Sequence, residues 1–312
     1  MEVTGIVVSI VMPTQRRPEA LARAVRSCFQ QDGVSPATLE MVVVDNDEHG
    51  SAEVVTAMLA AEAPFPLRYV HEPRPGVANA RNAGVAEARG ALIAFLDDDE
   101  EASPGWLAAL LEVQARFDAD LVFGPVRARV PDSVRDHRAY LERFFSRLDP
   151  APAGLIDYHY GCGDSLIRRA ALPGLPHPFS EARNHIGGED DLLFAQMKTQ
   201  GARIAWAPEA WVWEHPAPDR IGLKYAIRRA FVYGQGASTM CANATPPDRL
   251  GVAKWMIQGV AQAGVFGVVA AAQWAVGAPR RAFALDRAAR GLGKTFWWSP
   301  FKIRLYGRSA SA

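Results

Sequence analysis

Residues 91–99 read Ala-Leu-Ile-Ala-Phe-Leu-Asp-Asp-Asp, and this stretch determines how the rest of the chain is interpreted. Its first six residues are apolar without alternation, which is typical of a strand buried on both faces in a parallel sheet. Ligands of open α/β sheets bind at the carboxyl ends of the strands, so the three carboxylates that follow are candidate binding residues. In an extended segment, Asp97 and Asp99 share one face and Asp98 lies on the other.

Two carboxylates on one face repel each other unless a cation or a shared proton lies between them. Carboxylate oxygens are ligands that Mg²⁺ and Mn²⁺ prefer, and these ions usually also bind substrate phosphates. The alternative is a solvated acidic turn ahead of a helix that starts at Ser103-Pro104. The buried strand in front of the carboxylates favours the metal site.

The composition is that of a globular protein with an uneven charge distribution. The chain has 312 residues, 49% hydrophobic and 22% charged, which suffices for one large α/β domain with an appendage or two modest domains. From residue 278 onward, eight basic residues accompany one acidic residue, which predicts a tail for an anionic surface. Three scattered cysteines without disulfide or metal-ligand spacing fit a reducing cytosol, and the N-terminal segment lacks signal-peptide features.

Strand and helix patterns alternate through the first part of the chain, which predicts βαβ units with right-handed crossovers. The predicted strands are residues 6–12, 39–44, 67–71 and 91–96, and the predicted helices include residues 77–87 and 106–117. The second strand ends in Asp45, where a carboxylate is placed to accept hydrogen bonds from a ribose or a base. Alternatively, Asp45 caps the helix that begins near Ala52.

The helix over residues 77–87 follows a loop rich in proline and glycine. Arg81 in this helix is expected within reach of the strand end at Asp97, where an arginine suits a phosphate or a carboxylate. A surface arginine without a binding role is the alternative, and spacing alone does not decide between the two.

Five short motifs follow one another between residues 6 and 215. They are Pro13-Thr14 with Arg17, Val44-Asp45-Asn46, Ala80-Arg81-Asn82-x-Gly84, Phe95-Leu-Asp-Asp-Asp99 and Gly187-Gly-Glu-Asp-Asp191. With these motifs in this order the chain resembles family 2 inverting glycosyltransferases, which have the GT-A fold and use nucleotide-diphosphate sugars. The order of the five motifs makes the match specific over residues 6–215. The resemblance implies the same fold and the same class of donor.

The resemblance also implies roles for individual residues. Donor-binding candidates are Pro13, Thr14, Arg17, Asp45, Arg81, Asp97 and Asp98. Metal-ligand candidates, for Mn²⁺ or Mg²⁺, are Asp97, Asp99 and His215. Candidates for the acceptor or sugar pocket are Gly163, Asp164, Glu189 and Asp191, and the catalytic base is Asp190.

Three of these roles have alternatives. Because Asp191 directly follows the Glu-Asp pair, either Asp190 or Asp191 can face the substrate, and the family motif selects Asp190. Acidic residues in a first helical turn are also common partners of the helix dipole. For His215, the residue pattern favours a structural histidine over a metal ligand.

The composition changes beyond residue 218. Residues 255–277 are uncharged and long enough to span a bilayer, but small residues and glutamines make them weakly hydrophobic. A membrane helix, an in-plane helix and a helical hairpin packed on the enzyme all remain open. Basic residues around Trp297 and Trp298 are typical of segments that lie on anionic membranes. We therefore divide the chain into a catalytic domain, residues 1–218, and a helical, membrane-associating extension, residues 219–312.

We predict an α/β, GT-A-like fold with a mostly parallel nucleotide-binding sheet and a C-terminal helical extension. The expected function is inverting sugar transfer from a nucleotide-diphosphate sugar to a glycan or polyprenyl-linked acceptor. The expected location is the cytoplasmic face of the cell membrane. The expected partners include its anionic surface and do not include nucleic acid.

Two other classes of function are alternatives to sugar transfer. A sugar-nucleotidyltransferase should carry a glycine-rich basic loop after the first strand, which Pro13-Thr-Gln-Arg16 is not. A non-catalytic membrane-bound assembly partner would not need the carboxylates at residues 97–99 and 189–190.

Overall fold

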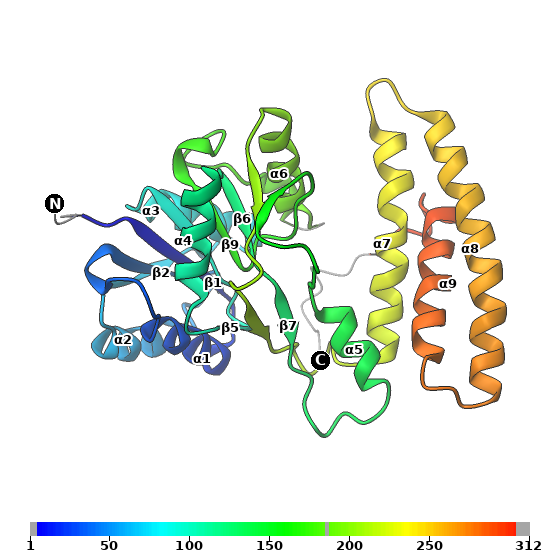
Figure 1. Cartoon of the computed structure of the whole chain (residues 1–312), viewed down its shortest axis with the longest axis horizontal. Helices are drawn as coiled ribbons and strands as arrows, with labels where there is room; N and C mark the ends of the chain where they lie inside the picture. Colours follow the sequence, from blue (N-terminus) through cyan, green and yellow to red (C-terminus); the bar gives the residue numbers. More distant parts are fainter. Residues whose placement is uncertain (1–4, 185–186, 304–312) are drawn as a thin grey trace. The chain divides into compact units, whose positions relative to one another are not determined.

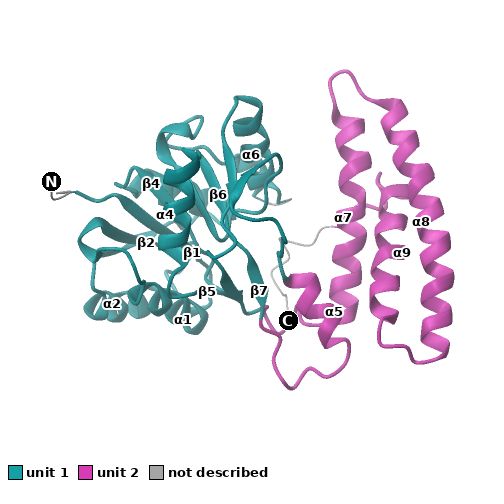
Figure 2. Cartoon of the chain, in the orientation of Figure 1, with its two compact units in different colours: residues 1–128, 146–215 teal, residues 129–145, 216–312 magenta. Residues whose placement is uncertain are grey.

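The computed structural model describes residues 5–184 and 187–303. The chain forms two compact units (Figure 2): unit 1 comprises residues 1–128 and 146–215, and unit 2 comprises residues 129–145 and 216–312. The sequence placed the division after residue 218 and gave no sign that residues 129–145 belong with the C-terminal helices. The end of the basic tail, with Arg304 and Arg308, lies outside the described residues.

Within the described residues, unit 1 is built on an eight-stranded sheet of order β3-β2-β1-β4-β9-β6-β10-β8 (Figure 1). The strands are β1 (Val8–Thr14), β2 (Leu39–Asp45), β3 (Leu67–His71), β4 (Leu92–Phe95), β6 (Leu121–Phe123), β8 (Gly154–Ile156), β9 (Ser165–Arg168) and β10 (Ile204–Trp206). Strands β1 to β4 are mutually parallel, as are β6 and β10, whereas β8 and β9 pair antiparallel with their neighbours. The predicted mostly parallel α/β fold is confirmed.

Helices cover both faces of this sheet because its central strands are apolar on both sides. One face carries α1 (Pro18–Phe29), α2 (Glu53–Glu62) and α4 (Trp106–Phe117), and the other carries α3 (Val77–Glu87) and α6 (Glu189–Thr199). Along β1, Ile10 belongs to the hydrophobic core under α1, α2 and α4, and Val11 belongs to the core under α3 and α6. Short 3₁₀ turns are η1 (Pro36–Thr38), η2 (Arg169–Ala171) and η3 (Glu181–Arg183).

A second, three-stranded sheet has the order β5-β11-β7, with β5 (Glu100–Ala102), β7 (Val126–Ala128) and β11 (Val212–Glu214). Residues 210–215 have the apolar and aromatic pattern of a strand, which predicts a further strand at the far side of the main sheet; β11 lies in this second sheet instead, so that prediction is wrong. Strands of three residues carry too little periodicity to select a partner, so the tertiary pairing decides.

Unit 2 contains α5 (Arg138–Phe145), α7 (Leu223–Asn243), α8 (Arg249–Ala275) and α9 (Arg281–Thr295). Helix α9 lies between α7 and α8 (Figure 1). Glycines allow this close packing: a Cβ on Gly293 would lie 2.0 Å from the carbonyl oxygen of Phe231, and one on Gly259 would lie 2.6 Å from that of Gly291. The segment that the sequence presented as a basic tail is thus in large part a packed helix.

Helix α8 is long and apolar enough to cross a membrane, judged by length and composition alone. Its most apolar 18-residue segment has a mean hydropathy of 1.4, and 11% of that segment is buried. In the part of the chain that the structure describes, it is the one helix with these properties.

Candidate active site

The site forms where parallel strands of unit 1 end at a common edge. Thr14, the last residue of β1, pairs in register with Asp45, the last residue of β2. Strand β4, parallel to β1, ends at Phe95, and only Leu96 separates it from the three aspartates. Because parallel strands end at the same edge of a sheet, the carboxyl ends of β1, β2 and β4 lie together, where open α/β sheets bind their ligands.

The chain turns at Asp98 and Asp99 instead of continuing in the extended conformation assumed from the sequence. Thr14 Oγ1 donates to Asp98 Oδ2 at 2.7 Å, and Arg17 Nη1 donates to Asp98 Oδ1 and to Asp99 Oδ2, each at 3.0 Å. Asp98 and Asp99 therefore share Arg17. The expectation that Asp98 points away from Asp99 is corrected by this turn.

Asp97 lies beside Arg81 of α3, whose Nη2 is 3.6 Å from Asp97 Oδ1. The same guanidinium binds Glu189 and lies 3.7 Å from Asp190 Oδ2. Helix α3 approaches the sheet closely at Gly84, where a Cβ would lie 2.3 Å from a methyl group of Val11. Arg81 is thus a buried ion-pair centre that joins two distant acidic motifs.

Asp190 and Asp191 occupy different environments at the start of α6. The Asp190 side chain is 18% exposed, and its Oδ2 accepts a hydrogen bond from the backbone amide of Cys162 at 3.0 Å. The Asp191 side chain is 73% exposed and lies 3.6 Å from His159 Nε2. Of the two, Asp190 belongs with Asp97 and Glu189 to the carboxylates around Arg81, and we call this group the Arg81 cluster.

The glycine-rich loop at residues 161–164 closes over the cluster. A Cβ on Gly163 would lie 2.6 Å from Asp97 Oδ2 and 2.8 Å from Glu100 Oε1. Arg147 holds the loop by donating to the carbonyl oxygens of Gly161, Gly163 and Asp164 at 2.9 to 3.1 Å. Its Nε also donates to the carbonyl oxygen of Gly124 at 2.9 Å.

Asp164, predicted for the sugar pocket, is fully buried. Its Oδ1 accepts from Trp106 Nε1 at 2.8 Å, and Arg147 lies 3.3 Å from its Oδ2. Burial raises the pKa of Asp164 to about 7, against the opposing charge of Arg147. The Asp164 carboxylate therefore contacts Trp106 and Arg147 inside the protein, whereas its neighbour Gly163 faces Asp97.

Crowding perturbs the other acids of the site. Burial raises the pKa of Asp97, Arg81 lowers it, and the charges of Asp99 and Asp190 raise it again. Burial and the charge of Asp99 raise the pKa of Asp98 to about 6. The pKa of Glu100 is well above its usual value because of burial and the charge of Asp97. The site holds more negative charge than its arginines balance.

Asp45 is buried and accepts hydrogen bonds from the backbone amides of Asp47 and Ala52 and from the Tyr69 hydroxyl, at 2.6 to 3.1 Å. These are the contacts of the helix-capping alternative. Pro13, beside Thr14 at the end of β1, is half-buried. Neither residue reaches the Arg81 cluster through a described contact.

His215 lies next to the aspartates through its backbone, which donates to the carbonyl oxygen of Asp99 at 2.8 Å. Its imidazole Nε2 lies 3.0 Å from Glu101 Oε2. Among residues 5–184 and 187–303, no three His, Cys, Asp or Glu side chains form a ready metal cage. The carboxylates of Asp97 and Asp99 still fit a hard cation that takes its remaining ligands from a diphosphate and water.

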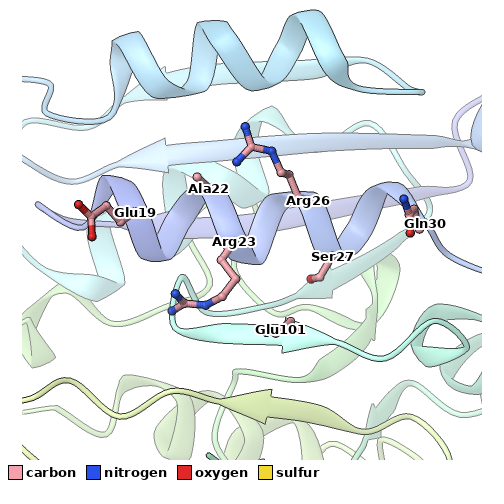
Figure 3. A pocket seen from close by; sticks show the side chains of 7 residues that line it. All are labelled: Glu19, Ala22, Arg23, Arg26, Ser27, Gln30 and Glu101. Carbon is pink, nitrogen blue, oxygen red and sulfur yellow. The ribbon is translucent and has the colours of Figure 1, made fainter. Parts of the chain in front are cut away.

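A hollow of about 500 Å³ lies on the outer side of α1 (Figure 3). It is lined by Glu19, Ala22, Arg23, Arg26, Ser27, Gln30 and Glu101. None of these residues belongs to the Arg81 cluster. Arg26 is already paired with Glu62, at 2.9 Å. We assign it no ligand.

Sequence reasoning missed several residues that shape the site. Glu100 lies against Gly163, the Cys162 amide binds Asp190, and Arg147 organises the loop. Asn184 Oδ1 accepts from the amides of Ala78 and Asn79, which caps α3. Backbone donors and long-range caps leave no pattern in the local sequence, so no signal pointed to them.

Comparison with known proteins identifies a family and several relatives of the chain. Residues 9–174 match the sequence profile of glycosyl transferase family 2. The chain is 37% identical over 237 residues to the succinoglycan biosynthesis protein ExoM of Rhizobium meliloti (strain 1021), covering 76% of this chain and 75% of that protein. It is 31% identical over 175 residues to the undecaprenyl-phosphate 4-deoxy-4-formamido-L-arabinose transferase of Sodalis glossinidius, covering 54% and 51%.

Among solved structures, S. aureus TarS 1–349 in complex with UDP-GlcNAc superimposes with a TM-score of 0.53 at 16% sequence identity. The match covers 79% of this chain and 70% of that chain. At this identity the likeness shows the fold.

Proposed function

This chain is a member of glycosyl transferase family 2, and we propose that it transfers a sugar, with inversion, from a nucleotide-diphosphate sugar to a hydroxyl of a glycan or lipid-linked acceptor. The observation that carries the proposal is the position of Arg81. Its guanidinium joins Asp97, at the donor-binding strand ends, to Glu189 and Asp190 at the start of α6. This supports the proposal, because a donor held near Asp97 would lie beside the carboxylate of Asp190.

In the proposed reaction, the Asp190 carboxylate accepts the proton of the acceptor hydroxyl, and the oxygen attacks the anomeric carbon from the face opposite the diphosphate. The bond from that carbon to the diphosphate oxygen breaks, and the nucleoside diphosphate leaves with the bonding electron pair. Support comes from the two backbone amides, of Cys162 and Asp191, that fix the orientation of the Asp190 carboxylate at 3.0 and 2.9 Å.

On the donor side, we assign Thr14 and Arg17 to orienting roles. Both hold Asp98, and Arg17 also holds Asp99, so the carboxylates at the strand ends have fixed positions. Fixed carboxylates bind ribose hydroxyls or a cation without losing side-chain entropy on binding.

A divalent cation held there would neutralise charge on the leaving diphosphate. Seven carboxylates of the site, contributed by residues 97–100, 164, 189 and 190, are accompanied by the guanidinium groups of Arg17, Arg81 and Arg147. A diphosphate entering so acidic a site needs accompanying positive charge. We therefore propose Mg²⁺ or Mn²⁺ at Asp97 and Asp99, with His215 as a further candidate ligand.

The acceptor and location remain part of the proposal. One relative is named for succinoglycan biosynthesis and another as an undecaprenyl-phosphate transferase, which supports a glycan or polyprenyl-linked acceptor. Such an acceptor places the enzyme at the cytoplasmic face of the membrane, where nucleotide sugars are available.

The test uses the purified full chain with UDP-, GDP- and dTDP-sugars, following release of the nucleoside diphosphate. Asp190→Asn should lower turnover by about 10²-fold or more while donor affinity persists. Asp191→Asn makes the same change on an exposed carboxylate and should stay near wild type. Loss of turnover in Asp191→Asn alone would shift the base by one residue, and no turnover of any donor would contradict the function.

A further inference from the structure

Helix α8 presents an apolar face to the outside of unit 2. Its members are Ile257, Val260, Val265 and Val268, each 60% to 72% exposed. We call these residues the outer face of α8. The side of α8 that packs on α9 is marked by buried small residues, Gly259 and Ala270. Residues 255–279 contain no charged side chain.

The adjacent helix α9 carries positive charges along the whole length of α8. Three cation–aromatic pairs form a ladder between them: Arg281 over Trp274 at 5.3 Å, Arg287 over Phe266 at 5.1 Å and Lys294 over Trp255 at 5.1 Å. If α8 crossed a bilayer in this packing, α9 would enter with it. Arg287 would then lie near the middle of the hydrocarbon, where a charged side chain is costly. The packed hairpin is therefore unsuited to crossing.

An in-plane orientation removes this conflict. Interfacial helices insert their apolar face about 5–10 Å into the boundary between headgroups and acyl chains. Packed helices lie about 8–10 Å apart, so a hairpin that inserts the outer face of α8 keeps the α9 cations at the level of the headgroups. Their long side chains can reach phosphate oxygens from there.

Charge selects a lipid surface over a second copy of the chain. Residues 249–303 contain eight lysines and arginines and a single acid, Asp286, which is paired with Arg290 at 2.7 Å. Two such hairpins meeting through their outer faces would repel each other, whereas an anionic surface attracts each of them.

We propose that the α8–α9 hairpin lies flat on an anionic membrane, with the outer face of α8 inserted at the headgroup boundary. The proposal deepens the proposed function and rests on it for its purpose, because a polyprenyl-linked acceptor would then lie in the same plane as the enzyme. Its test does not depend on turnover.

The experiment is vesicle flotation of the full chain, with phosphatidylglycerol–phosphatidylcholine vesicles compared with phosphatidylcholine alone. Wild type should float with the anionic vesicles. The double variant Val265→Asp with Val268→Asp should bind at least about tenfold more weakly, because two inserted apolar groups become charged. A matched control, Val54→Asp with Met58→Asp, places the same charges on exposed apolar positions of α2 in unit 1 and should bind as wild type does.

A second variant tests the charges: Lys254→Gln in α8 with Arg280→Gln at the N-cap of α9 should weaken binding about tenfold or more. High salt or alkaline carbonate should release the wild-type protein, whereas retention until detergent is added would show crossing and overturn the proposal. It would also be overturned by a lipid-free dimer that the outer-face variant dissociates without any loss of flotation. Flotation without turnover of any sugar donor would leave this inference standing and contradict the proposed function instead.

Discussion

The sharpest prediction concerns Gly163, whose missing side chain makes room for the carboxylates of the site. Neither Gly163 nor Gly161 has a positive φ, so an alanine at either position strains no backbone. The outcome is decided by space alone. At Gly163 a Cβ would lie 2.6 Å from Asp97 Oδ2 and 2.8 Å from Glu100 Oε1, whereas at Gly161 it would lie 3.4 Å from Asp190 Oδ2.

Because ordinary contact begins at 3.4 Å, Gly163→Ala requires the Asp97 carboxylate to move by about 0.8 Å. A displacement of about 1 Å in a positioning group costs about 10²-fold in rate, or about 2.7 kcal/mol of transition-state stabilisation. Gly161→Ala meets ordinary contact and should change the rate by less than about threefold.

The assay is steady-state release of nucleoside diphosphate from the full-chain protein, with folding of each variant checked by circular dichroism and thermal melting. We expect kcat to fall in Gly163→Ala with a melting temperature close to that of wild type. A folded Gly163→Ala with wild-type kcat would refute the reasoning, because Asp97 would then have no role at the position where the structure places it. Equal losses in both variants would point to the loop backbone instead.

Chelation with EDTA should abolish transfer and Mn²⁺ or Mg²⁺ should restore it, as measured by product formation; full activity after thorough chelation would exclude the cation. Arg147→Met should lower the free energy of unfolding in urea by about 3–5 kcal/mol, because it leaves buried carbonyls and a carboxylate unpaired, and Arg147→Lys should recover part of it. A thiol reagent should label only Cys241 in the native protein, because the other two cysteines are buried and burial raises the pKa of their thiols; labelling of two or three would show an open core.

Long elements with a regular pattern were predictable from the sequence. The helices at residues 77–87 and 106–117 and the strand at residues 67–71 have the predicted bounds in the structure. Each has a full period of apolar positions or clear boundaries in proline and glycine. The order of the five motifs identified the family, which the profile match confirms.

Short or long-range features were not predictable. The turn at Asp98 depends on Thr14 and Arg17, more than 80 residues earlier, so the local pattern could not exclude an extended segment. Arg147 stands in a run of arginines and aromatics that looks uniform, yet α5 ends at Phe145 and Arg147 belongs to unit 1. Helix α9 was hidden because its buried face consists of alanines and glycines among basic residues.

The position of the proposed base shows how such long-range contacts build the site. Asp190 is more than 90 residues from Asp97 in the chain, and no spacing rule brings the two together. The backbone just before α6 is attached to α3 through Asn184, whose Oδ1 caps the amides of Ala78 and Asn79. Because the same helix α3 carries Arg81, the cap and the ion pairs fix the start of α6 to one helix at two points. Asp190 therefore lies near Asp97 because α3 contacts both, and this long-range contact leaves no pattern in the local sequence.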